Sequence, residues 1–212
     1  MSRKFKIIKN YWNEKQNLYK KANIEIYPGI TVLVGCNGSG KTTLISQMKR
    51  KLDDENIPYV HFDNLFDGGE NARQAAGFRD DFAFLTTSIM SSEGENIMMN
   101  ISTYAKKIGK LISIAINDEL QEAWIFFDAV DSGLSIDGIK EIKDFLYNTV
   151  IADCNNKEVT VYIVISTNAY EFANGEQCFS VQECKYMTFT NYDDYSKFIM
   201  KSREMKDKRD GK

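Results

Sequence analysis

Residues 30–45 read ITVLVGCNGSGKTTLI, and this stretch decides the fold. Its first five residues are mostly apolar and β-branched, as in a buried strand, and the residues that follow are rich in glycine. Apolar residues then return at the spacing of one buried helix face, at Leu44, Ile45, Met48 and Leu52. The stretch therefore predicts a central strand, a glycine-rich loop and a helix over residues 41–53.

The glycine-rich loop carries the pattern Gly-x-x-x-x-Gly-Lys-Thr between a strand and a helix. Its glycines let backbone amides turn toward phosphate oxygens at a helix N-terminus. Lys41 is expected to bridge the β- and γ-phosphates, Thr42 to bind Mg²⁺ and Thr43 to add a phosphate contact. The residues predicted to bind ATP are Gly35, Cys36, Asn37, Gly38, Ser39, Gly40, Lys41, Thr42 and Thr43. The alternative is a glycine-rich turn that only caps the helix.

Strands and helices alternate on both sides of this stretch. Short strands are predicted within residues 4–34 and at 58–62, 124–127 and 159–165, and helices at 79–90, 92–118, from Ser135 and at 192–208. A polar stretch over 63–77 is predicted to be a functional loop. We expect an α/β P-loop NTPase fold with a mainly parallel central sheet, flanking helices and an N-terminal antiparallel β portion. Residues 1–212 form one domain, with a flexible tail over about 205–212.

The composition excludes several classes of protein. With 212 residues, 43 % apolar and 27 % charged, the chain suits one globular domain. A formal net charge of −3 gives no global electrostatic reason for nucleic-acid binding. The four cysteines form no Cys-x-x-Cys pair, and no apolar run approaches the roughly 20 residues that cross a bilayer. A cytoplasmic protein without membrane insertion is expected.

A second chemical signal is the acidic end of a buried strand. The strand over 124–127 runs directly into Asp128. A magnesium-nucleotide site needs an acidic residue at the end of a neighbouring buried strand, where it holds the ion opposite the hydroxyl of Thr42. We predict that Thr42 and Asp128 bind Mg²⁺, with water completing the octahedron. The alternative role of Asp128 is a helix or turn cap.

With these residues the chain resembles the ATP-binding-cassette ATPases, particularly the soluble branch that contains chromosome-maintenance and double-strand-break-repair ATPases. The segment Ser91-Ser92-Glu93-Gly94-Glu95 resembles their signature sequence, and residues 128–135 resemble the metal-binding aspartate with the loop that crosses the dimer interface. The resemblance implies a head-to-tail homodimer around two ATP molecules, in which Ser92 and Gly94 contact the partner's γ-phosphate. Ser92 is equally the start of a capping box before an apolar helix, and the two roles are compatible.

Three further residues are compared with the family's pattern. Gln74 lies roughly where the family places a glutamine that senses Mg²⁺ and the attacking water, and a surface glutamine is the alternative. Tyr11 and Trp12 lie at about the distance of an adenine-stacking aromatic, although we expect them to be partly buried strand residues.

The chain departs from the family where hydrolysis is concerned. Ala129 stands where a glutamate usually follows the metal-binding aspartate, and Asn168 stands where a histidine is expected. Losing a general base costs a factor of about 10² to 10⁴ in rate. Asp131 is a hypothetical substitute, Asn168 is able to position but not deprotonate a water, and His61, the only histidine, is expected to pack or hydrogen-bond at a strand end.

The leading hypothesis is a soluble ATPase that dimerises with ATP, hydrolyses it with Lys41, Asp128, Asp131 and Asn168, and requires ATP and Mg²⁺. A nucleic acid or another protein is a further candidate partner, consistent with a DNA-processing or mobile-element role, although no residue here is seen to recognise bases. The second hypothesis is an ATP-binding switch that hydrolyses little, which Ala129 and Asn168 suggest. The third is the energy-coupling subunit of a transporter.

Overall fold

The computed structural model describes residues 2–12, 16–64, 93–118 and 120–212. Within them the strands are β1 Arg3–Lys6, β2 Asn23–Ile26, β3 Gly29–Val34, β4 Tyr59–Asp63, β5 Glu122–Asp128, β6 Thr160–Ser166, β7 Gln177–Ser180 and β8 Lys185–Met187. The helices are α1 Lys41–Asp54, α5 Glu93–Asn117, α6 Ile136–Phe145, the π-helical η1 Leu146–Ile151, α7 Ala152–Asn156, α8 Tyr170–Ala173 and α9 Tyr192–Asp210. Strands and helices alternate along most of this chain.

The central sheet has the strand order β4-β5-β6-β3-β7-β8 in the described part of the chain. Neighbouring strands pair in parallel except β7 and β8, which are antiparallel. β1 and β2 form a separate antiparallel pair in which Arg3 lies opposite Ile26. The prediction of a mainly parallel sheet with an N-terminal antiparallel portion is confirmed.

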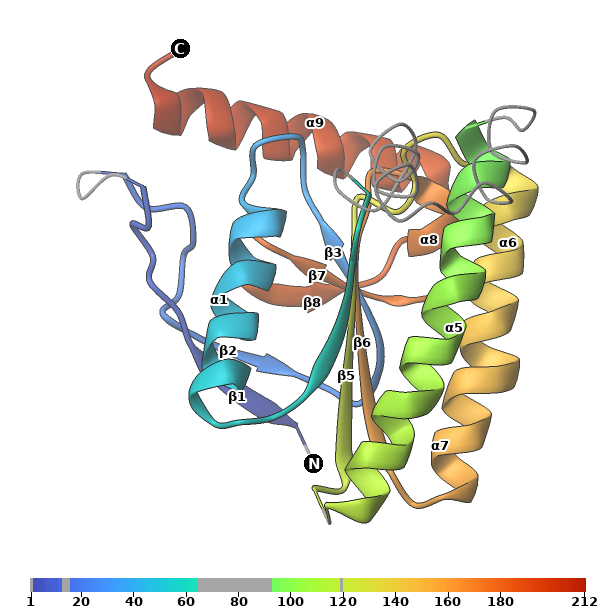
Figure 1. The fold of residues 1–212 in the computed structure, drawn as a ribbon. Helices are drawn as coiled ribbons and strands as arrows, with labels where there is room; N and C mark the ends of the chain where they lie inside the picture. Colours follow the sequence, from blue (N-terminus) through green and yellow to red (C-terminus); the bar gives the residue numbers. More distant parts are fainter. Residues whose placement is uncertain (1, 13–15, 65–92, 119) are drawn as a thin grey trace, which may run out of the picture.

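The middle strands are buried on both faces, because their side chains alternate between two apolar clusters. In β5, Ile125 and Phe127 belong to the cluster with α5 and α6, whereas Trp124 and Phe126 belong to the cluster with α1. Figure 1 shows α1 and the β1–β2 sheet on one side of the central sheet and α5, α6 and α7 on the other. In the same view, α9 crosses the end of the sheet where the loop between β3 and α1 lies. Packing on both faces holds the strand ends in fixed positions.

Most predicted elements are present, with three differences. The helix predicted from Ser135 continues through η1 and α7 to Asn156, and the last helix ends at Asp210, two residues later than predicted. β7 and β8 were not predicted, because strands of four and three residues are too short to show a clear alternation. The helix predicted over 79–90 and nearly all of the loop predicted over 63–77 lie outside the described residues.

The described residues contain neither a membrane-spanning helix nor a disulfide. None of their helices combines the length and apolar character that a membrane span requires. All four cysteines are free and buried. The fold of this part of the chain therefore depends on packing and hydrogen bonds rather than on disulfides.

Candidate functional site

Three parallel strands bring their carboxyl ends together at one edge of the sheet. β3 leads into the glycine-rich loop, residues 35–40, while β5 ends at Asp128 and β6 at Ser166. Open α/β sheets bind their ligands at this edge. The sequence places Asp128 on a neighbour of β3, whereas the structure places it one strand further away, because β6 pairs with both β3 and β5.

Three glycines of the loop, Gly35, Gly38 and Gly40, have positive φ, and two of them illustrate why glycine is needed. Gly38 has φ 77° and Gly40 has φ 102°, both in the left-handed region that favours glycine. A Cβ on Gly40 would lie 3.1 Å from the hydroxyl oxygen of Tyr19, which donates a hydrogen bond to the Gly40 carbonyl at 2.9 Å. Gly40 also caps α1, whose first amides have no acceptor within the helix. The loop thus makes a tight turn in front of a helix N-terminus, a place where anions bind.

Lys41 is the buried cation of the site, with only 8 % of its surface exposed. Its ammonium donates hydrogen bonds to the Gly35 carbonyl at 2.7 Å and to Asn168 Oδ1 at 2.8 Å. Burial lowers the pKa of Lys41 below its ordinary value, and the nearby Asp131, Cys36 and Asp128 partly oppose that shift. Both strong acceptors are neutral, so within the described residues the ammonium is bonded to no counter-ion.

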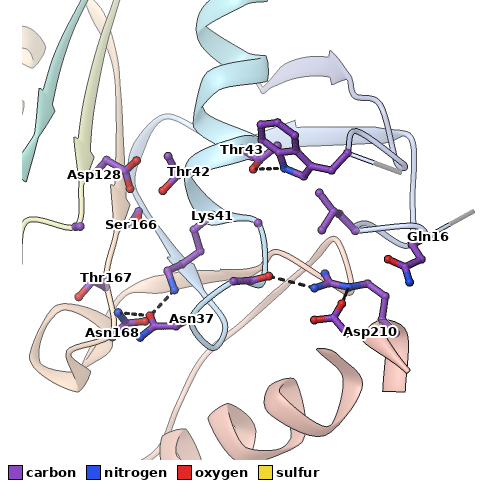
Figure 2. A pocket seen from close by; sticks show the side chains of 16 residues that line it. Gln16, Asn37, Lys41, Thr42, Thr43, Asp128, Ser166, Thr167, Asn168 and Asp210 are labelled. Atoms are coloured by element: carbon purple, nitrogen blue, oxygen red, sulfur yellow. Dashed lines mark hydrogen bonds and ion pairs between the residues drawn. The ribbon is translucent and has the colours of Figure 1, made fainter. Parts of the chain in front are cut away.

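Asn168 connects the loop with the segment that follows β5. Its Nδ2 donates to Asn37 Oδ1 at 2.9 Å while its Oδ1 accepts from Lys41, as the dashed lines in Figure 2 show. Its backbone N–H donates to Asp131 Oδ2 at 3.0 Å, and its carbonyl accepts from the Tyr195 hydroxyl at 2.9 Å. Both polar groups of the Asn168 side chain are therefore bonded to protein. Asp131 supports Asn168 and is not among the residues that line the pocket.

Asp128 is the buried carboxylate of the site. It is 2 % exposed, and its Oδ1 has no hydrogen-bond partner among the described residues. Asp63, at the end of β4, lies opposite Asp128 in the parallel register, and His61 lies two residues before it. One ligand atom from each of these three residues lies within 4.8 Å of the other two. Since an unpaired buried charge is costly, this corner of the site suits a cation.

The protonation of His61 decides which cation fits that corner. His61 Nδ1 lies 2.8 Å from the Lys49 ammonium, which only donates, so Nδ1 accepts. The neutral ring then carries its proton on Nε2, and neither ring nitrogen offers a lone pair to a metal ion. In this arrangement the groups of this cluster that could hold a metal ion are the carboxylates of Asp63 and Asp128, and oxygen is the ligand that Mg²⁺ prefers. The predicted hydrogen bonding of His61 is confirmed, but the residue lies in the middle of β4 and not at a strand end.

One pocket of about 420 Å³ is lined by the loop, the strand ends, the segment around Trp12 and the last turn of α9. Its inner end is lined by Thr42, Asp128, Ser166, Thr167 and Asn168 (Figure 2). Its outer end is lined by Trp12, Gln16, Leu18, Arg209 and Asp210. Of the nine loop and helix residues predicted to bind nucleotide, Gly35, Cys36 and Ser39 do not line the pocket. The carbonyls of Gly35 and Cys36 accept hydrogen bonds from Lys41, the second at 3.5 Å.

Trp12 corrects one expectation. The sequence suggests a partly buried strand residue, but β1 ends at Lys6 and the Trp12 side chain is 74 % exposed. Its indole N–H donates to Thr43 Oγ1 at 3.2 Å, which holds the ring at the mouth of the pocket. The sequence suggests a strand residue because the apolar residues Phe5 and Ile7, which precede Trp12, alternate with polar ones.

Asp63, Arg209 and Asp210 were not predicted as site residues. Asp63 does carry a signal, since an apolar strand ends in aspartate there, as it does at Asp128. Arg209 and Asp210 carry none, because their positions depend on how the last helix packs.

Three predicted residues remain untested. Gln74 and Ser92 lie outside the described residues, and for Gly94 the structure gives only its place in the first turn of α5. Ala129 lines the pocket beside Asp128, and its N–H donates to the Ser166 carbonyl at 3.1 Å. The position at which the resemblance would place a carboxylate is therefore occupied by an alanine that lines the pocket.

Comparisons of the chain with models of known protein families, with curated proteins and with solved structures found no match. The likeness to the cassette ATPases therefore stays a resemblance of motifs, and the function is argued from the site.

Proposed function

We propose that this chain binds ATP with Mg²⁺ in the pocket at the carboxyl edge of its sheet, using the glycine-rich loop as a P-loop. One observation carries the proposal: the buried Lys41 ammonium and the buried Asp128 carboxylate line the same pocket, from the two sequence motifs that predict these roles. The glycine-rich loop and the strand that ends at Asp128 lie far apart in the sequence, and each is recognisable without the other. Their meeting at one pocket is what a nucleotide-binding site requires.

The pocket fits a triphosphate in size and in charge. A volume of about 420 Å³ lies within the range of small-molecule sites. Lys41 has neutral acceptors at present, and phosphate oxygens would give it stronger, charge-assisted hydrogen bonds. The N-terminus of α1 adds unpaired amides to the same side of the pocket.

The inner corner fits Mg²⁺. Figure 2 shows the side chains of Asp128 and Thr42 pointing toward one another. The unpartnered Asp128 Oδ1 and the Thr42 hydroxyl would be the protein's ligands, with Asp63 close behind. Bound there, the ion would neutralise charge on the β- and γ-phosphates.

The outer end would hold the nucleoside. The exposed indole of Trp12 is held by Thr43, the second residue after Lys41 in α1, and so lies beside the expected path of the phosphates. Bases stack on exposed aromatic rings because every base has a flat π-face. Trp12 is therefore the residue proposed to contact adenine.

Hydrolysis is proposed to be slow. Ala129 cannot take a proton. The side-chain oxygen and nitrogen of Asn168 are already hydrogen-bonded to Lys41 and Asn37. These observations favour the second candidate function, an ATP-binding switch in which nucleotide changes the state of the protein with little turnover. Asp131 is the remaining candidate base, and it would have to leave the backbone N–H of Asn168 to act.

Asp131→Asn tests whether Asp131 is the base, because an asparagine oxygen still accepts a hydrogen bond from the Asn168 N–H but takes no proton. If Asp131 is the base, hydrolysis falls by about a hundredfold or more. If turnover in Asp131→Asn equals that of the wild type, Asp131 is not the base and only holds Asn168 in place.

The dimer is part of the same proposal, with Ser92 and Gly94 acting on the partner's nucleotide. The experiment measures Mg²⁺-dependent ATP hydrolysis per chain over a range of protein concentrations, beside Lys41→Ala as a control for contaminating ATPase. Turnover per chain that rises with concentration and disappears in Lys41→Ala supports a dimeric ATPase. ATP binding without turnover supports the switch. The absence of both ATP binding and turnover would contradict the proposal.

A further inference from the structure

The C-terminal helix α9 lies against the glycine-rich loop along one helix face. Ser202 Oγ accepts a hydrogen bond from the Cys36 N–H at 2.9 Å, and Arg209 Nη2 donates to the Gly38 carbonyl at 3.3 Å. Between them, the end of the Lys206 side chain lies 3.0 Å from where a Cβ on Gly38 would stand. Ser202, Lys206 and Arg209 are spaced by four and three residues, so they share a helix face. This face of α9 is the outer wall of the loop.

A buried network fixes the helix in that position. Ser202 is 1 % exposed and donates to Gln182 Oε1 at 2.5 Å, while Gln182 Nε2 donates back to the Ser202 carbonyl at 3.2 Å. Buried hydrogen bonds of this kind are costly to break. The last turn of α9 is therefore held at the pocket by interactions that lie two turns away from it.

Arg209 brings a positive charge into the pocket wall from this last turn. Its side chain is 15 % exposed, and it lines the outer end of the pocket with Asp210. Its Nε donates to Asp210 Oδ1 at 2.8 Å, and its Nη1 is buried without a hydrogen-bond partner among the described residues. A guanidinium has five N–H donors, and buried donors normally have acceptors. The Gly38 carbonyl and the Asp210 carboxylate leave most of this capacity unused.

We propose that Arg209 is a phosphate-binding residue of the nucleotide site, supplied by the C-terminal helix. This inference rests on the proposed function and extends it, since it makes α9 part of the site. Arg209 contacts the loop at Gly38, on the outer side of the pocket, whereas Asp128 lies at the inner end. A phosphate oxygen is a stronger acceptor for guanidinium than the neutral Gly38 carbonyl. When ATP binds, the Arg209 guanidinium donates to a phosphate oxygen instead of the Gly38 carbonyl. The triphosphate then lies between two cations, Lys41 and Arg209.

The test is equilibrium competition against a fluorescent ATP analogue bound to the full chain. The competitors are ATP and inorganic tripolyphosphate, which has the phosphate chain but no base or ribose. Arg209→Gln is expected to weaken both competitors by about tenfold, the size of one lost hydrogen bond to a charged group. Arg209→Lys recovers part of that loss, because it restores the charge without the planar fork.

The matched control is Arg203→Gln on the same helix, whose side chain is 62 % exposed and pairs with Asp207. It should bind both competitors as the wild type does. Unchanged tripolyphosphate affinity in Arg209→Gln, beside a clear loss in Lys41→Ala, would overturn the phosphate contact and leave the proposed function intact. Equal affinity in the wild type and in Lys41→Ala would overturn both. A loss in Arg209→Gln that Arg209→Lys does not recover, together with a lower melting temperature, would assign Arg209 to packing alone and also overturn the inference.

Discussion

The inner and outer ends of the pocket are built in different ways. At the inner end, Asp128 and Ser166 stand at the ends of paired strands and are each 2 % exposed. At the outer end, Trp12 comes from a loop and is 74 % exposed, while Arg209 comes from the last turn of α9. The sheet fixes Asp128 and Ser166 in place, whereas Trp12 and Arg209 reach the pocket from opposite parts of the sequence, Trp12 through Thr43 and Arg209 through Gly38. Trp12 is proposed to hold the nucleoside and Arg209 a phosphate. Substitutions at the two ends should therefore change different properties of binding.

The largest effect is expected from Lys41→Ala at the inner end. Loss of charge-assisted hydrogen bonds to two phosphates, each about 1.5–3 kcal/mol, should weaken ATP binding by about a hundredfold or more. Isothermal titration calorimetry measures this directly. Lys197→Ala, on the exposed side of α9, is the control and should bind as the wild type does. Wild-type affinity in Lys41→Ala would show that the buried ammonium does not contact the ligand.

Asp128→Asn should remove most of the response to Mg²⁺. In the presence of Mg²⁺ the affinity for ATP is expected to fall by about tenfold or more, because the ion loses its buried anionic ligand. With a chelator present, the affinity should stay equal or rise, since a negative charge near the phosphates has been removed. The measurement is the ratio of ATP affinities with Mg²⁺ and with chelator. A ratio equal to that of the wild type would place the metal elsewhere, and Asp63→Asn would then be the variant to compare.

Trp12→Ala tests the outer end. Stacking of a base on an aromatic ring is worth about 1–3 kcal/mol, so ATP should bind about tenfold more weakly. Tripolyphosphate, which has no base, should bind as tightly as it does to the wild type. Trp12→Phe keeps a ring and should retain most of the affinity for ATP. Equal losses for ATP and tripolyphosphate would mean that Trp12 supports the loop through Thr43 and does not contact a base.

The smallest expected effect is the pH dependence of ATP affinity, which depends on Lys41 at the inner end. Burial lowers the pKa of Lys41 below 10.5, so the free site loses its cation at a lower pH than an exposed lysine would. ATP affinity should therefore fall as the pH is raised toward 10.5. The fall begins once the pH passes the lowered pKa of the unliganded lysine, because binding then requires uptake of a proton. Lys41→Ala should lack this fall. An equally steep fall in Lys41→Ala would assign the dependence to other groups.

The inner end was largely predictable from the sequence, because its two motifs are local. The pattern from Gly35 to Thr42 fixes a strand, a turn and a helix within a few residues, and Asp128 ends an apolar run. What local patterns do not contain is the strand order. Asp63 lies opposite Asp128 in the register of β4 and β5, and β6 lies between β5 and β3. Both arrangements depend on how distant segments of the chain assemble.

The outer end was not predictable for the same physical reason. Arg209 and Gly38 are separated by 171 residues, and the charged sequence around Arg209 is typical of a solvated helix end. A flexible tail over about 205–212 remains a prediction, although the helix extends to Asp210 and contacts the loop. The contact arises because Ser202 anchors α9 beside the loop, and such tertiary packing leaves no pattern in a single sequence.

Calorimetric titration of the full chain with ATP, once with Mg²⁺ and once with chelator, tests the central claim most directly. The account predicts saturable binding of one ATP per chain that is tighter with Mg²⁺. No saturable binding in either condition, by a chain whose circular dichroism shows a folded α/β protein, would contradict it.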